Sequence, residues 1–242
     1  MLAGPPSTQT YYDRFSRTYD DHRHRGYHRM IDALELELVR RHGAGGDILE
    51  AGCGTGLLLK EASAIGRSAV GVDLSRGMLG QARARGLRVL QAGITSIPLP
   101  SAAFDLVYSM KVLAHVPPIE AALAELARLV RPGGHLLLEF YNPWSLRYLT
   151  KRLGGPARIA QETTDHDVFT RYDTLARARR YLPPGVRLLS TRGVRIFTPT
   201  SKVWRLPALG SAFEQAERWA CDLPGLRGLG GFLILVCQKQ RA

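Results

Sequence analysis

Residues 48–56 read ILEAGCGTG, an apolar run that breaks into three glycines at alternate positions. A second apolar run, AVGVD at 69–73, follows and ends on an acid. This pattern predicts a buried strand, a tight glycine turn, a helix, and a second strand whose carboxyl end carries Asp73. Such an arrangement is typical of a nucleotide-type pocket in a parallel α/β sheet, where a carboxylate binds ribose hydroxyls.

The glycine spacing differs from the one that binds dinucleotides. A dinucleotide fingerprint requires Gly-x-Gly-x-x-Gly, whereas here Gly52, Gly54 and Gly56 alternate and Leu57 stands at the place of the last glycine. Glu50, just before the turn, would repel a pyrophosphate but suits a cationic ligand. S-adenosylmethionine carries a sulfonium and an ammonium, and its carboxylate can accept backbone N–H groups at the start of the next helix. The turn therefore favours S-adenosylmethionine over NAD, and hence methyl transfer.

Four segments in order resemble the successive motifs of class I S-adenosylmethionine-dependent methyltransferases. They are LEAGCGTGL at 49–57, VGVDLS at 70–75, FDLVYS at 104–109 and LVRPGGHLL at 129–137. The lead-in YYDRFSRTYD at 11–20 is similar to that of the type-11 subgroup, which is found in quinone, biotin and natural-product biosynthesis. The resemblance is good up to about residue 140 and poor beyond it, so it bears on fold and cofactor more than on substrate.

The alternation of strands and helices predicts an α/β fold with a parallel sheet covered on both faces. The resemblance implies a Rossmann-like, seven-stranded sheet of order 3-2-1-4-5-7-6 with its last strand antiparallel. We expect a single methyltransferase domain over 1–242. Its expected parts are an N-terminal helical cap (1–45), a donor-binding core (46–141), a substrate lid (142–180) and the C-terminal strands 6 and 7 (181–242).

Local patterns predict the individual elements. Helices are expected at 8–25, 28–42 and 56–65, after an N-cap at Ser75, and after Pro117-Pro118. Strands are expected at 48–51, 69–73, 88–92, 104–109, 135–141, 186–197 and 231–238. The segment 131–134, Arg-Pro-Gly-Gly, is expected to be a turn between helix and strand.

Ligands of open α/β sheets lie beyond the carboxyl ends of the strands, so these ends supply the candidate donor-binding residues. Asp73 is expected to hold the ribose hydroxyls, although a carboxylate there can also cap the next helix. Leu74 and Met78 are expected to flank the adenine ring. The full candidate set is Tyr19, Glu50, Gly52, Cys53, Gly54, Gly56, Asp73, Leu74, Met78, Gly93, Ile94 and Ser109.

One position departs from the family pattern. Members commonly carry an acid after the third strand that bonds the adenine amino group, and here that position holds Gly93. Adenine recognition is therefore expected to rest on backbone groups near Ile94 or on water. Tyr19 matches the lead-in tyrosine of the family and is expected over the methionine end of the donor, with core packing as the alternative.

Two residues just past the strand at 104–109 are candidates for catalysis or substrate binding. His115 can deprotonate a hydroxyl nucleophile, because histidine titrates near neutral pH; a packing role is the alternative. Lys111 can bind an anionic group of the substrate, and a solvated surface lysine is the alternative.

The segment WSLRYLTKRL at 144–153 predicts a small amphipathic helix with basic flanks. It follows the fifth strand, where this family inserts its substrate cover. We interpret it as a lid for an apolar, anionic small molecule or as a membrane-facing patch, with a helix packed on the core as the alternative.

Charge is unevenly placed along the 242 residues, whose formal net charge is +12. Residues 1–140 carry 16 Lys and Arg against 14 Asp and Glu, and residues 141–242 carry 17 against 7. A basic C-terminal section can attract an anionic substrate, nucleic acid or an acidic membrane surface. An arginine-rich composition without function is the alternative, and no aromatic interleaving suggests a base-stacking surface.

Cysteine usage and hydropathy bound the remaining classes. Cys53, Cys221 and Cys237 show no ligand spacing or paired framework, and we expect no signal peptide or membrane span, which together predict a reduced cytoplasmic protein. The acids of Asp165-His166-Asp167 suggest a metal, but without a further ligand nearby a polar loop is the better interpretation, and no metal is expected.

The sequence therefore predicts methylation of a small-molecule metabolite, with oxygen favoured over nitrogen or carbon as the acceptor atom. Methylation of RNA or of a ribosomal component stays open because of the basic C-terminal section. A protein that binds S-adenosylmethionine without catalysis is the third hypothesis. The sequence gives no indication of oligomeric state.

Overall fold

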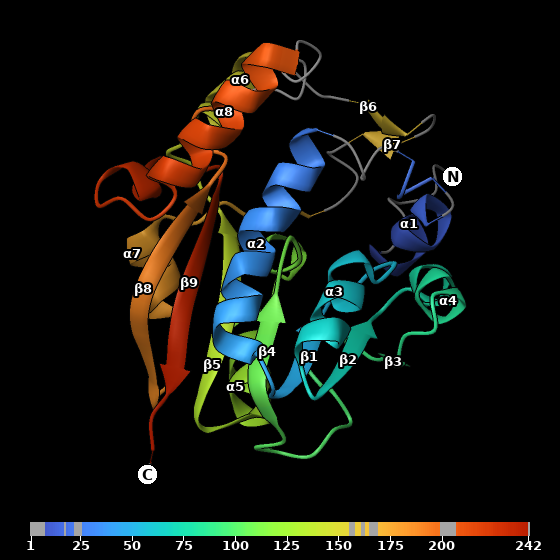
Figure 1. Ribbon diagram of the computed structural model, residues 1–242. Helices are drawn as coiled ribbons and strands as arrows, with labels where there is room; N and C mark the ends of the chain where they lie inside the picture. Colours follow the sequence, from blue (N-terminus) through green and yellow to red (C-terminus); the bar gives the residue numbers. More distant parts are fainter. Residues whose placement is uncertain are drawn as a thin grey trace, which may run out of the picture.

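A seven-stranded sheet organises the computed structural model, which describes residues 8–16, 18–21, 26–154, 158–160, 163–164, 169–198 and 207–241. Its strands are β1 (Asp47–Ala51), β2 (Ser68–Asp73), β3 (Val89–Gln91), β4 (Phe104–Ser109), β5 (Val130–Tyr141), β8 (Val186–Val194) and β9 (Phe232–Lys239). They are ordered β3-β2-β1-β4-β5-β9-β8, and β9 runs antiparallel to both of its neighbours (Figure 1). Counted in chain order, this is the predicted 3-2-1-4-5-7-6 arrangement.

Helices cover both faces of this sheet. They are α1 (Thr8–Phe15), α2 (Tyr27–Gly43), α3 (Leu57–Ile65), α4 (Arg76–Ala84), α5 (Ile119–Leu129), α6 (Leu146–Gly154), α7 (Leu175–Arg180) and α8 (Pro207–Ala220). Two 3₁₀ turns, η1 (Leu113–His115) and η3 (Leu226–Leu229), and a small ribbon of β6 (Arg158–Ala160) and β7 (Thr163–Thr164) complete the described elements. In Figure 1, α2 and α3 lie in front of the sheet and α5 lies behind it.

The core is divided into two layers because side chains of a strand alternate between the faces of the sheet. Leu137 of β5 packs with α2 and α3, whereas its neighbours Leu136 and Leu138 pack with α5 and α7. Along α2, the apolar residues Met30, Ile31, Leu34, Leu38 and Val39 recur at the helical period and are buried. Each fully buried aliphatic side chain of this kind contributes about 1.5–3 kcal/mol to the free energy of unfolding.

The N-terminus of α4 is held by two caps. Ser75 Oγ accepts a hydrogen bond from Met78 N at 3.1 Å, which confirms the predicted N-cap. Asp13 Oδ1 accepts from Gly77 N at 2.9 Å and from Ser75 Oγ at 2.5 Å. A carboxylate at this end also favours the helix dipole. These bonds tie α1 to the turn after β2 and so position the N-terminal segment.

Arg192 joins β8 to α2 from a position that is only 2% exposed. Its guanidinium donates to Leu34 O at 2.9 Å and ion-pairs with Glu37 and Asp222. Its charge is thus neutralised within the fold, as a buried cation requires.

Some predicted boundaries are wrong. The segment 131–134 is part of β5 rather than a separate turn, because a register shift between Phe104 and Leu106 accommodates it, with Gly133 at a φ of 84°. The helix expected to reach residue 25 ends at Phe15, and the strand expected to reach 197 ends at Val194. Within the described residues, no helix combines the length and apolar character needed to cross a membrane.

Candidate active site

An open cleft lies where β1 and β4 end. Its lining residues come from the N-terminal segment, the glycine turn and the turn after β4. They are Tyr19, Glu50, Gly52, Cys53, Gly54, Thr55, Leu57, Leu58, Met110 and Lys111. Five of the predicted donor-binding residues and Lys111 therefore meet at one place. Leu57 and Leu58 were not predicted to line the cleft, because an apolar side chain at the start of a helix does not by itself indicate a ligand.

The three glycines of the turn have different roles. All three have positive φ, at 83° for Gly52, 53° for Gly54 and 81° for Gly56, in the region that side chains rarely adopt. An added Cβ would lie 2.2 Å from Val112 Cγ2 at the first position and 2.4 Å from Leu87 Cδ1 at the third, but would meet no atom within 4 Å at Gly54. The outer glycines allow close packing, and the middle one leaves the backbone accessible from the cleft.

Asp73 connects the glycine turn with the next helix. Its Oδ2 accepts from Gly54 N at 2.8 Å, and its Oδ1 accepts from Ser75 N at 2.9 Å. Burial raises the pKa of this carboxyl, while the backbone hydrogen bonds oppose the shift. The N-cap of α4 is Ser75, so Asp73 does not cap the helix itself but holds the residue that does. The expected role in ribose binding stays a prediction for the same carboxylate at the end of β2.

Glu50 is buried at the base of the cleft, with 3% of its surface exposed. Tyr108 Oη donates to its Oε2 at 2.9 Å, because the parallel register pairs these two residues on β1 and β4. Burial raises the pKa of Glu50 to about 8. Tyr108 was missed from the sequence, since the register between strands 58 positions apart leaves no local signal.

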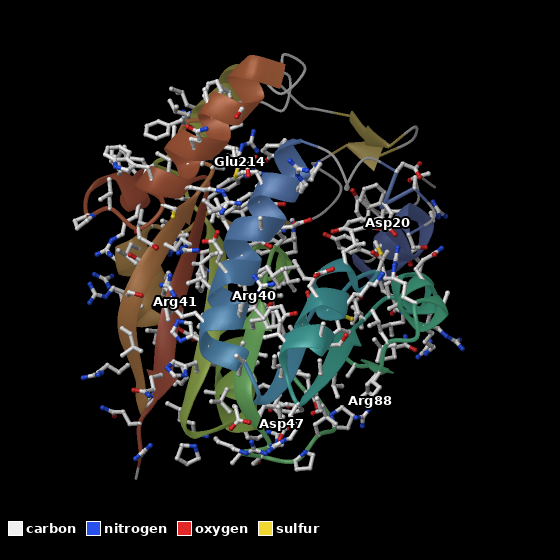
Figure 2. The ribbon with its side chains drawn as sticks, in the orientation of Figure 1. Asp20, Arg40, Arg41, Asp47, Arg88 and Glu214 are labelled. Atoms are coloured by element: carbon white, nitrogen blue, oxygen red, sulfur yellow. The ribbon has the colours of Figure 1, made fainter. Side chains whose placement is uncertain are left out.

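The N-terminal segment lies across the glycine turn. Asp20 Oδ1 accepts from Thr55 Oγ1 at 2.8 Å, and Arg85 ion-pairs with Asp20 and also donates to Thr55 O. Figure 2 shows Asp20 on the side of the molecule where α1, α3 and α4 gather. These contacts place the neighbouring Tyr19 in the cleft lining, as the lead-in motif suggested.

Lys111 is ion-paired with acids of α2 in this structure. Its Nζ donates to Asp32 Oδ1 at 2.9 Å and to Glu35 Oε2 at 2.7 Å, both on α2. The backbone N of Lys111 donates to Glu139 Oε1 at 3.0 Å. Lys111 itself adopts a positive φ of 61°. Lys111 thus pairs with the half-buried Asp32 and the buried Glu35, which the packing of α2 brings against the sheet. The expectation that it binds an anionic group stays a prediction.

His115, four residues after Lys111 of the cleft lining, faces a group of aromatic rings. Its ring centre lies 5.6 Å from that of Tyr141 and 6.4 Å from that of Tyr12. The ring centres of Tyr141 and Tyr172 are 6.0 Å apart. The Nδ1 atom is 2.9 Å from Phe169 O. Because a carbonyl oxygen only accepts, neutral His115 carries its proton on Nδ1 and its basic lone pair on Nε2.

The remaining predicted residues lie outside the cleft lining. Ser109 is buried, and its Oγ donates to Ala51 O at 2.8 Å, so it joins strands rather than facing a ligand. Met78 is also buried. Leu74, Gly93 and Ile94 lie near the ends of β2 and β3, where an adenine site is predicted.

The possible metal ligands at 165–167 lie outside the described residues. Within the described part of the chain, no three His, Cys, Asp or Glu side chains group together as metal ligands would. The Cys53 thiol, in the glycine turn, has its pKa raised by burial, which disfavours the reactive thiolate.

Comparison with known proteins decides the family. Residues 49–138 match the family model for a methyltransferase domain. A ubiquinone biosynthesis O-methyltransferase of Thiobacillus denitrificans is 32% identical over 193 residues, which cover 74% of this chain and 81% of the relative. A second ubiquinone biosynthesis O-methyltransferase, of Aromatoleum aromaticum, is 30% identical over 221 residues, which cover 85% of this chain and 92% of that relative. The chain belongs to the S-adenosylmethionine-dependent methyltransferases.

The fold of the methyltransferase agrees with this assignment. A solved S-adenosylmethionine-dependent methyltransferase of Thermotoga maritima, described as a possible histamine N-methyltransferase, superposes with a TM-score of 0.69 at 22% identity. The match covers 96% of this chain and 99% of that one. At this identity the likeness establishes the fold and does not bear on the substrate.

The cleft of the methyltransferase fits the donor that the family uses. The buried acid Glu50 suits positively charged groups, the open backbone at Gly54 allows close approach, and Asp73 can accept from hydroxyls. These residues would hold S-adenosylmethionine, which supplies an electrophilic methyl group on a sulfonium.

The pKa of Glu50 predicts how donor binding by the methyltransferase depends on pH. Near pH 7 most of this carboxyl is protonated, because its pKa is about 8. A cationic ligand prefers the carboxylate, so affinity for S-adenosylmethionine should rise with pH by up to about tenfold per unit below the pKa. Isothermal titration calorimetry across this range measures the slope.

Glu50→Gln is the matched control, because it keeps the shape of the side chain and cannot ionise. Titration of the donor itself affects the variant and the unchanged protein alike. If donor affinity depended on pH equally in both, the dependence could not be assigned to Glu50. The raised pKa also means that the free energy of unfolding of the ligand-free protein decreases as the pH rises from about 4.5 to about 8, where the folded protein still holds the proton that the unfolded chain has lost. Glu50→Gln should remove that decrease.

Proposed function

We propose that the protein transfers the methyl group of S-adenosylmethionine to a hydroxyl oxygen of a small, largely apolar or aromatic metabolite. The observation that carries the proposal is the position of His115 in the turn after β4, which also supplies Met110 and Lys111 to the cleft lining. The Nδ1 atom of His115 lies at a carbonyl, and aromatic rings surround the imidazole. The two relatives described above are named O-methyltransferases, which supports oxygen as the acceptor atom.

The protein's residues have two tasks in such a transfer. Near His115, the acceptor oxygen forms a bond to the methyl carbon as the carbon–sulfur bond breaks, and its proton passes to Nε2. General-base catalysis of this kind typically contributes about 10²–10⁴-fold to the rate. The aromatic rings of Tyr12, Tyr141 and Tyr172 align an apolar acceptor and exclude water. Alignment can supply up to about 7–11 kcal/mol of the barrier.

The basic C-terminal section offers less free charge to RNA than its composition suggests. Arg171, Arg192 and Arg218 are each ion-paired with carboxylates of the same chain. The main source of nonspecific affinity for a nucleic acid is the release of its counterions when arginine and lysine neutralise the phosphates. An arginine that is already paired with a carboxylate of its own chain contributes less to this release. The small-molecule acceptor is therefore preferred over RNA.

Transfer of a labelled methyl group tests the proposed function. Purified protein is incubated with trideuteromethyl-labelled S-adenosylmethionine and a small-molecule extract of cells that lack the gene. We expect a new labelled compound, formed together with S-adenosylhomocysteine, whose label NMR places on oxygen. Label on nitrogen or carbon, label only in the RNA or protein fraction, or no transfer would each overturn the proposal.

A further inference from the structure

Two arginine side chains from distant parts of the chain meet above one glycine. A Cβ added at Gly231 would lie 3.1 Å from Arg147 Cδ and 3.5 Å from Arg195 Cδ. Arg147 belongs to α6, Arg195 follows β8, and Gly231 precedes β9. The fold thus brings two positive charges together at the rim of the aromatic group around Tyr141.

Arg147 differs from the other arginines of this section. Its guanidinium carbon lies 4.7 Å from the ring centre of Tyr141 and 5.1 Å from that of Phe232. No carboxylate of the described residues ion-pairs with it, in contrast to Arg171 and Arg192. Its side chain is half-buried against the two rings, and no carboxylate of the described ranges neutralises its charge.

Arg195 is held in place by its surroundings. Its Nε donates to Thr198 O at 2.9 Å, and its guanidinium carbon lies 4.9 Å from the ring centre of Tyr27. Its φ of 65° is unusual for a residue other than glycine, a strain that often marks functional positions. Burial, together with the charge of Arg147, lowers its pKa.

The charge of the Glu217 carboxylate acts on Arg195 and opposes the lowering of its pKa, but no hydrogen bond or ion pair between the two side chains is present among the described residues. Its two oxygens accept from the backbone N–H groups of residues 196–198 and from the Thr198 hydroxyl. The positive charges of Arg147 and Arg195, both half-buried, repel each other more strongly than they would in water, because the dielectric constant is lower there. An anion bound between them would relieve this repulsion, and arginine binds carboxylate and phosphate oxygens in a bidentate manner.

The arginine pair lies within reach of the proposed base. The Tyr141 ring centre is 5.6 Å from the His115 ring centre and 4.7 Å from the guanidinium carbon of Arg147. The imidazole of His115 and the guanidinium of Arg147 are therefore at most about 10 Å apart, the sum of these two distances. One aromatic ring with a short side chain spans such a distance. We infer that Arg147 and Arg195 bind the anionic group, a carboxylate or phosphate, of an acceptor whose hydroxyl lies at His115. This inference rests on the proposed function.

Binding of a matched acid and amide tests the site without turnover. The protein, saturated with S-adenosylhomocysteine, is titrated calorimetrically with 3-(4-hydroxyphenyl)propanoate and with its uncharged amide. We expect the acid to bind at least about tenfold more tightly, as a charge-assisted pair with arginine provides. Arg147→Gln and Arg195→Gln should each remove most of this preference and leave the affinity for the amide unchanged.

Arg152→Gln is the matched control, because Arg152 lies exposed on the same helix as Arg147. Arg147→Lys, which keeps the charge but not the bidentate geometry, should retain part of the preference and guards against a folding defect in the glutamine variant. Equal binding of acid and amide, no binding of either at millimolar concentration, or a preference that survives both glutamine substitutions would overturn the inference.

The outcomes separate this inference from the proposed function. Arginine-dependent preference for the acid, without any O-methylated product in the labelling experiment, would overturn the proposed function and leave the anion site standing. O-methylation of a neutral acceptor, together with equal binding of acid and amide, would confirm the proposed function and overturn the anion site. Titration with inorganic phosphate distinguishes the two anions: competition with the acid would indicate that the site accepts a phosphate group as well.

Discussion

Asp73→Ala is expected to weaken binding of S-adenosylmethionine by at least about a hundredfold. The substitution removes the acceptor predicted for the ribose hydroxyls and also leaves the N–H groups of Gly54 and Ser75 without their partner. Each unsatisfied buried group costs about 1–3 kcal/mol. Calorimetric titration with S-adenosylmethionine and with S-adenosylhomocysteine measures the loss.

Asp13→Asn is the control for this prediction. Asp13 also accepts from the start of α4, at Gly77 N and Ser75 Oγ, but it does not line the cleft. Its replacement should lower the midpoint of thermal unfolding while donor affinity stays within about threefold, a difference of less than 1 kcal/mol. Retained affinity in a folded Asp73→Ala protein would mean that the donor site is assigned to the wrong place.

His115→Ala is expected to lower kcat by about 10²–10⁴-fold with the product identified in the labelling experiment. The Kd for S-adenosylmethionine should be unchanged, because His115 does not line the donor cleft. Single-turnover measurement with donor bound in advance separates methyl transfer from binding and product release.

Two further variants separate catalysis from packing at this position. His115→Phe keeps a ring against Tyr141 but has no basic nitrogen, so it should be as slow as His115→Ala. Near-normal turnover by the phenylalanine variant would show that the ring serves packing alone. His135→Gln is the control, because the pKa of His135 is lowered by burial and its ring lies beside His42, at the other end of β5.

Much of the donor site was predictable because its determinants are local. The glycine turn requires positive φ at three alternating positions, and glycine adopts this conformation without strain. Asp73 ends a strand that its own apolar pattern reveals. The N-cap at Ser75 follows from the side chain of one residue and the backbone three positions on. Each of these signals is contained within a few consecutive residues.

Errors arose where tertiary contacts override the local pattern. The segment 131–134 has the composition of a turn, yet it forms a bulge within β5, because Val130 pairs with Phe104 before it and His135 pairs with Leu106 after it. The ion pairs of Lys111 with Asp32 and Glu35 were not predicted either, because α2 meets the end of β4 only in the folded chain. Neither acid is near Lys111 in sequence, so no local pattern indicated the ion pairs.

The sequence by itself determined the α/β sheet, the glycine turn and the acid at the end of β2, because strand periodicity and backbone conformation depend on neighbouring residues. Only the tertiary structure decided the protonation of Glu50, which follows from its burial beside Tyr108. It also decided the meeting of Arg147 with Arg195, because antiparallel pairing of β9 brings Gly231 beneath both. Desolvation and charge proximity act through space, and a single sequence does not record which distant segments share that space.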